Sequence, residues 1–104
     1  MKSKETRTAI DLADEALFWL AKSEGAEESA NARRQVIEDK VRRELSLKKK
    51  AYTERDVQSI TDFRASQDPQ WQMHVANNQY YDRKITRYTM ASQAKMLLEV
   101  NSAV

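Results

Sequence analysis

The chain has 104 residues, of which 40% are apolar and 33% are charged, and its formal net charge is +2. This length predicts a single domain, residues 1–104. The absence of cysteine excludes disulfide bonds and thiolate metal sites and fits a cytoplasmic protein, and the small net charge excludes strong nonspecific binding to nucleic acid by charge alone.

Glycine and proline each occur once, as Gly25 and Pro69. They are the main breaks in a chain that otherwise consists largely of strong helix formers. We therefore expect an all-α protein without strands. The longest apolar run, residues 16–21, is too short to span a membrane, and the basic N-terminus lacks the apolar segment of a signal peptide.

The first predicted helix covers about residues 3–22. Two neighbouring rows of apolar side chains repeat along it at helical spacing. The first row is Ile10, Ala13, Leu17 and Leu20, and the second row is Ala9, Leu12, Ala16 and Trp19. Together the two rows predict one broad buried face.

The second predicted helix covers about residues 26–50. Glycine adopts the left-handed conformation that ends many helices, so Gly25 would close the first helix and fold the two into an antiparallel hairpin. One continuous helix through Gly25 is the alternative, because glycine inside a helix costs only about 1 kcal/mol.

The third predicted helix is short and covers about residues 54–65. Thr53 is its expected N-cap, and Asp56 completes an approximate capping box. The expected buried side is Val57, Ile60 and Phe63.

The fourth predicted helix covers about residues 69–99. Asp68 is its expected N-cap and Pro69 occupies the one helical position that favours proline. Beyond residue 90 the helix is apolar on nearly every side, which is typical of a buried helix. We therefore expect an all-α fold of three to four helices, arranged as antiparallel helical hairpins in a small, elongated, dimeric bundle. The candidate oligomer interface is Trp71, Tyr81, Ile85, Tyr88, Met96, Leu97 and Leu98.

No residue pattern predicts catalysis, a metal site or a cofactor. His74 is the sole histidine, whereas structural zinc needs four nitrogen or sulfur ligands. The acidic side chains near Asp11 and near Glu38 fall on the polar sides of amphipathic helices rather than in a cleft that would perturb their pKa values. One glycine cannot build a loop that holds phosphate, and no nucleophile motif occurs. We expect a protein that is not an enzyme.

Basic side chains gather in two places. They are Lys40, Arg42, Arg43, Lys48, Lys49 and Lys50 near the end of the second predicted helix, and Arg83, Lys84 and Arg87 among the tyrosines of the fourth. Such cations can follow a phosphate backbone, and the tyrosines can stack on bases. The same residue types equally suit a helix C-terminus and a protein interface, so both interpretations stay open.

Three segments carry a resemblance: Thr53-Glu-Arg-Asp-Val, Ser66-Gln-Asp-Pro-Gln-Trp and Lys95-Met-Leu-Leu-Glu. With the preceding basic helix, their order over residues 26–100 resembles small helical-hairpin accessory proteins of tailed phages, found among replication and recombination genes. The resemblance implies an intracellular accessory protein that binds a host or phage protein of DNA metabolism. The alternative function is direct binding of DNA or RNA by the basic end of the second helix.

Overall fold

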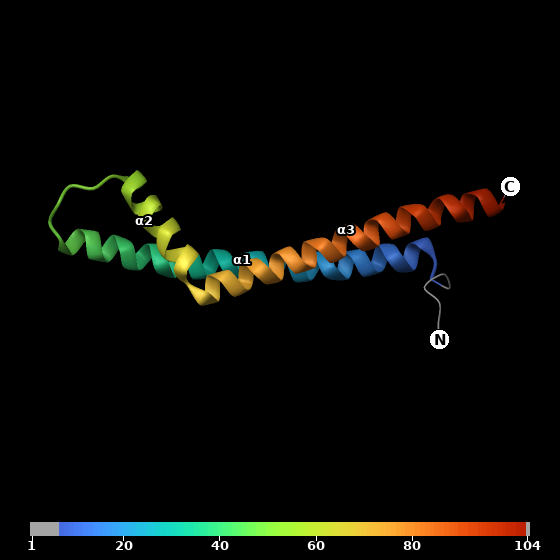
Figure 1. Ribbon diagram of the computed structural model, residues 1–104, viewed down its shortest axis with the longest axis horizontal. Helices are drawn as coiled ribbons and strands as arrows, with labels where there is room; N and C mark the ends of the chain where they lie inside the picture. The colour runs from blue at the N-terminus through green and yellow to red at the C-terminus, as the bar shows by residue number, and fades with distance from the viewer. Residues whose placement is uncertain (1–6, 104) are drawn as a thin grey trace. The chain divides into compact units, whose positions relative to one another are not determined.

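The computed structural model describes residues 7–103, which contain three helices and no strand (Figure 1). Helix α1 is Ala9–Leu47, α2 is Glu54–Gln67 and α3 is Pro69–Ala103. Helices hold 91% of this part of the chain, so the expected all-α class is confirmed.

Helix α1 passes through Gly25 without a break, so the expected break is wrong and the continuous alternative is correct. Gly25 does not have a positive φ. A Cβ atom built on it would meet nothing within 4 Å. The glycine is therefore an ordinary helical residue, and the strong helix formers on either side outweigh its small cost.

Thr8 and Asp11 cap the start of α1. The backbone N–H of Asp11 donates to Thr8 Oγ1 at 3.2 Å, and the backbone N–H of Thr8 donates to the Asp11 carboxylate at 3.0 Å. This reciprocal pair satisfies two N–H groups that the helix itself cannot. The predicted helix start at residue 3 lies outside the described residues.

The C-terminal end of α1 lies at Leu47, before the expected end at residue 50. Lys49 has a φ of 55°, the left-handed conformation that ends many helices. Its backbone N–H donates to the carbonyl oxygen of Ser46 at 3.4 Å. The conformation expected at Gly25 therefore occurs at Lys49, and residues 48–50 follow the helix rather than belonging to it.

The start of the short helix α2 is capped as predicted, whereas its end lies at Gln67 rather than near residue 65. Thr53 is its N-cap, and the capping box with Asp56 is present in both directions. Asp68 is the C-cap of α2, and its backbone N–H donates to the carbonyl oxygen of Ala65 at 3.0 Å. The same residue stands at the start of α3, where its carboxylate accepts a hydrogen bond from the Trp71 backbone N–H at 2.8 Å. Pro69 follows as the first residue of α3.

The chain expected as a single domain forms two compact units. Unit 1 is Met1–Glu24 with Asn78–Val104, and unit 2 is Gly25–Asn77. Helices α1 and α3 each contribute to both units, whereas α2 belongs to unit 2 alone.

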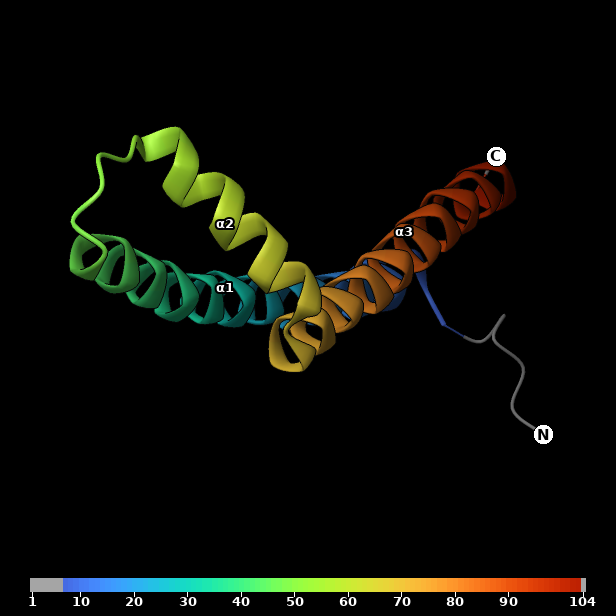
Figure 2. The ribbon, with the colours of Figure 1, turned by 60° about the vertical axis from the view of Figure 1, so that its left-hand side comes forward.

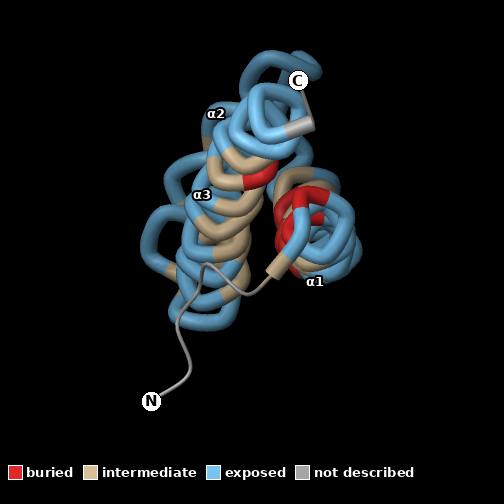
Figure 3. The backbone as a smooth tube through the Cα atoms, turned by 90° about the vertical axis from the view of Figure 1, so that its right-hand side faces the viewer, coloured by how far each residue is buried: buried red, intermediate tan, exposed pale blue. Residues whose placement is uncertain are grey.

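In unit 1, α1 and α3 run antiparallel (Figure 1). Ser92 Oγ donates to the carbonyl oxygen of Ala9 at 2.8 Å, and Asn78 Nδ2 donates to the carbonyl oxygen of Ser23 at 3.0 Å. Figure 3 shows the buried positions on the side of α1 that faces α3. We call this contact the seam, and its buried residues on α1 are Ala9, Leu12, Ala16 and Ser23.

Unit 2 contains an antiparallel hairpin of α1 and α2, joined by residues 48–53, and the first turns of α3 (Figure 2). Ion pairs link the two helices, from Arg34 to Asp62 at 2.6 Å and from Arg42 to Glu54 at 2.5 Å. The hydrophobic core is Ile37, Val41, Val57 and Ala65, with Leu45, Ile60 and Trp71 packed against it.

The buried side of α2 differs in part from the prediction. Val57 is fully buried as expected, but Phe63 is 68% exposed, so that prediction is wrong. Thr61 and Ala65 are buried instead, because four-residue spacing from Val57 keeps them on the face toward α1. The Thr61 hydroxyl donates to the carbonyl oxygen of Val57 at 2.7 Å, so burial leaves it hydrogen-bonded.

Candidate interaction surface

Only one of the two apolar rows on α1 is covered. The second row forms the seam, whereas the first row faces water: Ile10 is 73% exposed and Leu17 is 61% exposed. The expectation of one broad buried face is therefore wrong. We call the exposed residues the outer row: Ile10, Ala13, Leu17 and Leu20.

The end of α3 in unit 1 is also exposed and apolar. We call its exposed residues the C-terminal apolar segment: Met90, Met96, Leu97, Leu98 and Val100. Soluble chains rarely leave so many large apolar side chains in water unless something binds them. The outer row and this segment together give unit 1 most of the exposed large apolar residues in the described part of the chain.

The seven candidate oligomer residues fall into two groups. Met96, Leu97 and Leu98 are exposed and free to meet another molecule. The other four are half-buried within the chain's own packing: Tyr81, Ile85 and Tyr88 in unit 1 and Trp71 in unit 2. A tyrosine or tryptophan at helical spacing looks the same in sequence whether it is core or interface.

Trp19 is the centre of an aromatic cluster in unit 1. Its ring stacks on Tyr81 with centroids 5.7 Å apart and meets the ring of Phe18 edge-on at 5.2 Å. The Lys84 ammonium lies 5.8 Å from the Trp19 ring centroid and 5.4 Å from that of Tyr80. These aromatic faces and Lys84 are therefore engaged inside the unit. The Trp19 Nε1–H is buried and has no acceptor in the described part of the chain.

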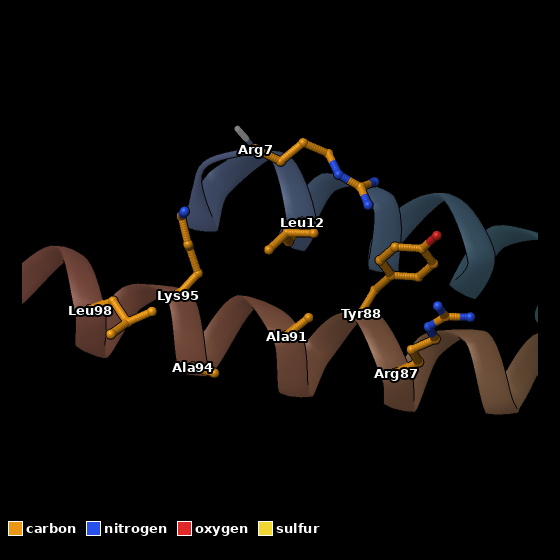
Figure 4. A pocket seen from close by; sticks show the side chains of 8 residues that line it. All are labelled: Arg7, Leu12, Arg87, Tyr88, Ala91, Ala94, Lys95 and Leu98. Atoms are coloured by element: carbon orange, nitrogen blue, oxygen red, sulfur yellow. The ribbon is translucent and has the colours of Figure 1, made fainter. Parts of the chain in front are cut away.

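A groove opens beside the seam of unit 1 (Figure 4). Its volume is about 280 Å³. Three cations and five apolar or aromatic residues line it: Arg7, Arg87, Lys95, Leu12, Tyr88, Ala91, Ala94 and Leu98. The Arg7 guanidinium lies over the Tyr88 ring, 5.6 Å from its centroid, which fixes one cation at the rim.

The nine basic candidate residues do not come together in one unit. Arg83, Lys84 and Arg87 belong to unit 1, and the run from Lys40 to Lys50 belongs to unit 2. Arg42 is engaged by Glu54 at 2.5 Å and Glu38 at 3.3 Å. The exposed members that make no salt bridge within residues 7–103 are Lys40, Arg43, Lys48, Lys49, Lys50, Arg83 and Arg87.

The acidic residues serve the fold. The Asp11 carboxylate caps α1, and hydrogen bonds from Thr8 lower its pKa. Hydrogen bonds from Gln58 and Arg42 lower the pKa of Glu38, and Arg64 lowers that of Glu44. Each shift favours the ionised form, the opposite of what a general acid needs. His74 is half-buried on α3, and no cluster of three metal-binding side chains occurs among the described residues.

The groove was not predicted from the sequence. Arg87, Ala91, Ala94 and Leu98 follow one another at helical spacing on α3, which was the available signal. Arg7 and Leu12 come from a distant part of the sequence, and only the antiparallel packing of unit 1 places them beside that stripe.

Neither long helix, over the residues described, contains a stretch apolar enough to cross a bilayer. Comparison of the sequence with family models, with curated proteins and with solved structures finds no match. The exposed surfaces of the chain are therefore the guide to its function.

Proposed function

We propose that the chain is a non-enzymatic accessory protein that acts by binding another protein. The observation that carries this proposal is the outer row, where Ile10 is 73% exposed and Leu17 is 61% exposed beside a covered seam. An apolar row that runs along a rigid helix is a typical docking surface for a second protein.

The proposed partner is a host or phage protein of DNA replication or recombination. The support for this class is the resemblance of residues 26–100 to phage helical-hairpin accessory proteins. A cytoplasmic location is part of the proposal and is supported by the absence of cysteine from the sequence.

Affinity capture tests the proposal. The immobilised wild-type chain, an Ile10→Glu/Leu17→Glu variant and a Phe63→Glu control are compared in lysate from the cell that produces the protein. Phe63 is 68% exposed but lies in unit 2, so the control adds charge away from the outer row. We expect one partner to bind the wild type and the control, to be lost from the double variant and to survive nuclease treatment. Equal capture by all three chains would refute the proposal.

Self-association is the second part of the proposal. Leu97 is 66% exposed within the C-terminal apolar segment, and a second copy would remove this apolar surface from water. Sedimentation of the wild type should show an oligomer that Leu97→Glu dissociates. Leu47→Glu, at a residue 81% exposed in unit 2, is the matched control and should leave the oligomer intact.

Direct binding of nucleic acid is the second candidate function. It is favoured by the exposure of Lys48, Lys49 and Lys50 beyond the end of α1, with no salt bridge to the described residues. If they contact phosphates, replacing all three with Glu should weaken binding to every sequence alike and lower its salt dependence. We expect only weak binding by the wild type at physiological salt. Tight binding that the triple variant abolishes would reverse the order of the two functions.

A further inference from the structure

The groove of unit 1 is long enough for about three turns of a helix. On α3 its lining runs from Arg87 to Leu98, which at 1.5 Å per residue is about 16 Å, or three helical turns. Ala91 and Ala94 are small, so a helix backbone can approach the floor closely. Leu12 and Tyr88 supply apolar surface from the seam, and Leu98 remains 62% exposed at one end.

The charge of the groove differs from the charge of its surroundings. The described residues of unit 1 hold six basic and six acidic side chains. The groove lining holds three basic side chains, Arg7, Arg87 and Lys95, and no acidic one. Figure 4 shows Arg7 just before the start of α1, with its guanidinium on the side of Tyr88, and Arg87 and Lys95 on α3. This lining suits an occupant that combines apolar side chains with negative charge.

We propose that the groove binds an acidic amphipathic helix of the partner protein. Its apolar side chains would lie on the floor formed by Leu12, Ala91 and Ala94, and its carboxylates would face Arg87 and the Arg7 guanidinium at the rim. This inference rests on the proposed protein-binding function and adds the chemistry of the partner.

The floor of the groove argues against nucleic acid as the occupant. Its residues between the cations are Leu12, Ala91, Ala94 and Leu98, which offer no flat face for a base. The one aromatic ring, Tyr88, is already covered by Arg7.

The test uses a synthetic peptide of glutamate, alanine and leucine, with leucines at helical spacing and a fluorescein label. The same peptide with lysine in place of every glutamate is its control. Fluorescence anisotropy at physiological salt should show that the wild-type chain binds the glutamate peptide about tenfold more tightly, which two partly exposed ion pairs can supply.

Two matched variants locate the site. Arg87→Glu reverses a charge in the groove, whereas Arg83→Glu makes the same change one turn earlier on α3 and outside the lining. The preference for the glutamate peptide should disappear in Arg87→Glu and persist in Arg83→Glu. Ala94→Glu, which places a carboxylate on the floor, should also abolish it, and circular dichroism of each variant checks that the helices remain.

Four results would overturn the proposal. The first is equal binding of the two peptides to the wild type, or an unchanged preference in Arg87→Glu. The second is displacement of the peptide by an oligonucleotide at the same concentration, which would make the groove a phosphate site. The third is an oligomer that Arg87→Glu dissociates and Arg83→Glu does not, which would make a second copy the occupant.

The fourth result separates the groove proposal from the proposed function. If Ile10→Glu/Leu17→Glu loses the captured partner and Arg87→Glu keeps it, the groove proposal fails while the proposed function remains in place.

Discussion

Arg33 donates two hydrogen bonds to the carboxylate of Asp68, from Nε at 2.9 Å and from Nη2 at 2.8 Å. The same carboxylate accepts the backbone N–H of Trp71. Asp68 therefore ties α1 to the point where α2 ends and α3 begins. These bonds lower its pKa from the ordinary 3.8 to about 2, mainly through Arg33 and then through Trp71.

We expect this aspartate to make unit 2 sensitive to acid. Because the folded pKa is lower than the unfolded one, the stabilisation is complete above pH 3.8 and is lost as the pH falls toward about 2. Asp68→Asn keeps a capping side chain but removes the charge, so its urea midpoint should fall less steeply than that of the wild type over this range. The other carboxylates titrate in both chains and cancel in the comparison. Equal slopes would show that the ion pair does not form.

The core of unit 2 predicts a contrast between two residues of α2. Val57→Ala removes two methyl groups from a side chain with 0% exposure and should cost about 2 kcal/mol in the free energy of unfolding. Phe63→Ala removes a larger side chain that is 68% exposed and should cost less than about 0.5 kcal/mol. Urea titration of both variants measures the difference, and a larger cost for Phe63 would mean that this ring is covered in solution.

Gly25 should be a site where alanine stabilises the protein. The residue is helical, and a Cβ atom there meets no neighbour within 4 Å, so Gly25→Ala should raise the free energy of unfolding by about 0.5–1 kcal/mol. Thermal melting followed by circular dichroism checks this. A lower melting temperature would indicate a left-handed glycine and two separate helices.

The buried Ser92 hydroxyl in the seam should contribute to the stability of the protein. Ser92→Ala removes the hydrogen bond to the carbonyl oxygen of Ala9 and should lower stability by about 1 kcal/mol. Ser102→Ala, at an exposed position on the same helix, is the control and should have no measurable effect. If the two variants melt alike, the register of α1 and α3 in unit 1 differs from the one described.

Features that depend on neighbouring residues could be predicted from the sequence. Thr53 with Asp56, and Asp68 before Pro69, set helix ends through hydrogen bonds between side chains and the backbone a few residues away. Whether the helix breaks at Gly25 could not be predicted in this way. The cost of a helical glycine, about 1 kcal/mol, is smaller than the combined preference of the neighbouring residues for helix. The result also depends on packing along the whole of α1.

The choice between the two rows of α1 depends on tertiary structure. Both rows have helical spacing, so periodicity alone favours neither. The seam uses the row that contains Ala9 and Ala16, and both of these side chains are buried. The larger Ile10 and Leu17 stay outside. The groove also depends on tertiary structure. The sequence marked Arg87 as a candidate contact for nucleic acid or a partner, but it did not place Leu12 of α1 beside it.

The division into two units gives each its own fluorophore. Trp19 lies in unit 1 and Trp71 in unit 2, and the chain has no other tryptophan. Replacing either one with phenylalanine leaves a chain whose emission reports on a single unit. Helices α1 and α3 run through both units without interruption. Comparison of the two unfolding curves therefore tests whether unfolding of one unit is coupled to unfolding of the other. Coincident curves would mean that the helices melt as wholes, and separate curves would mean that one half can open while the other keeps its packing.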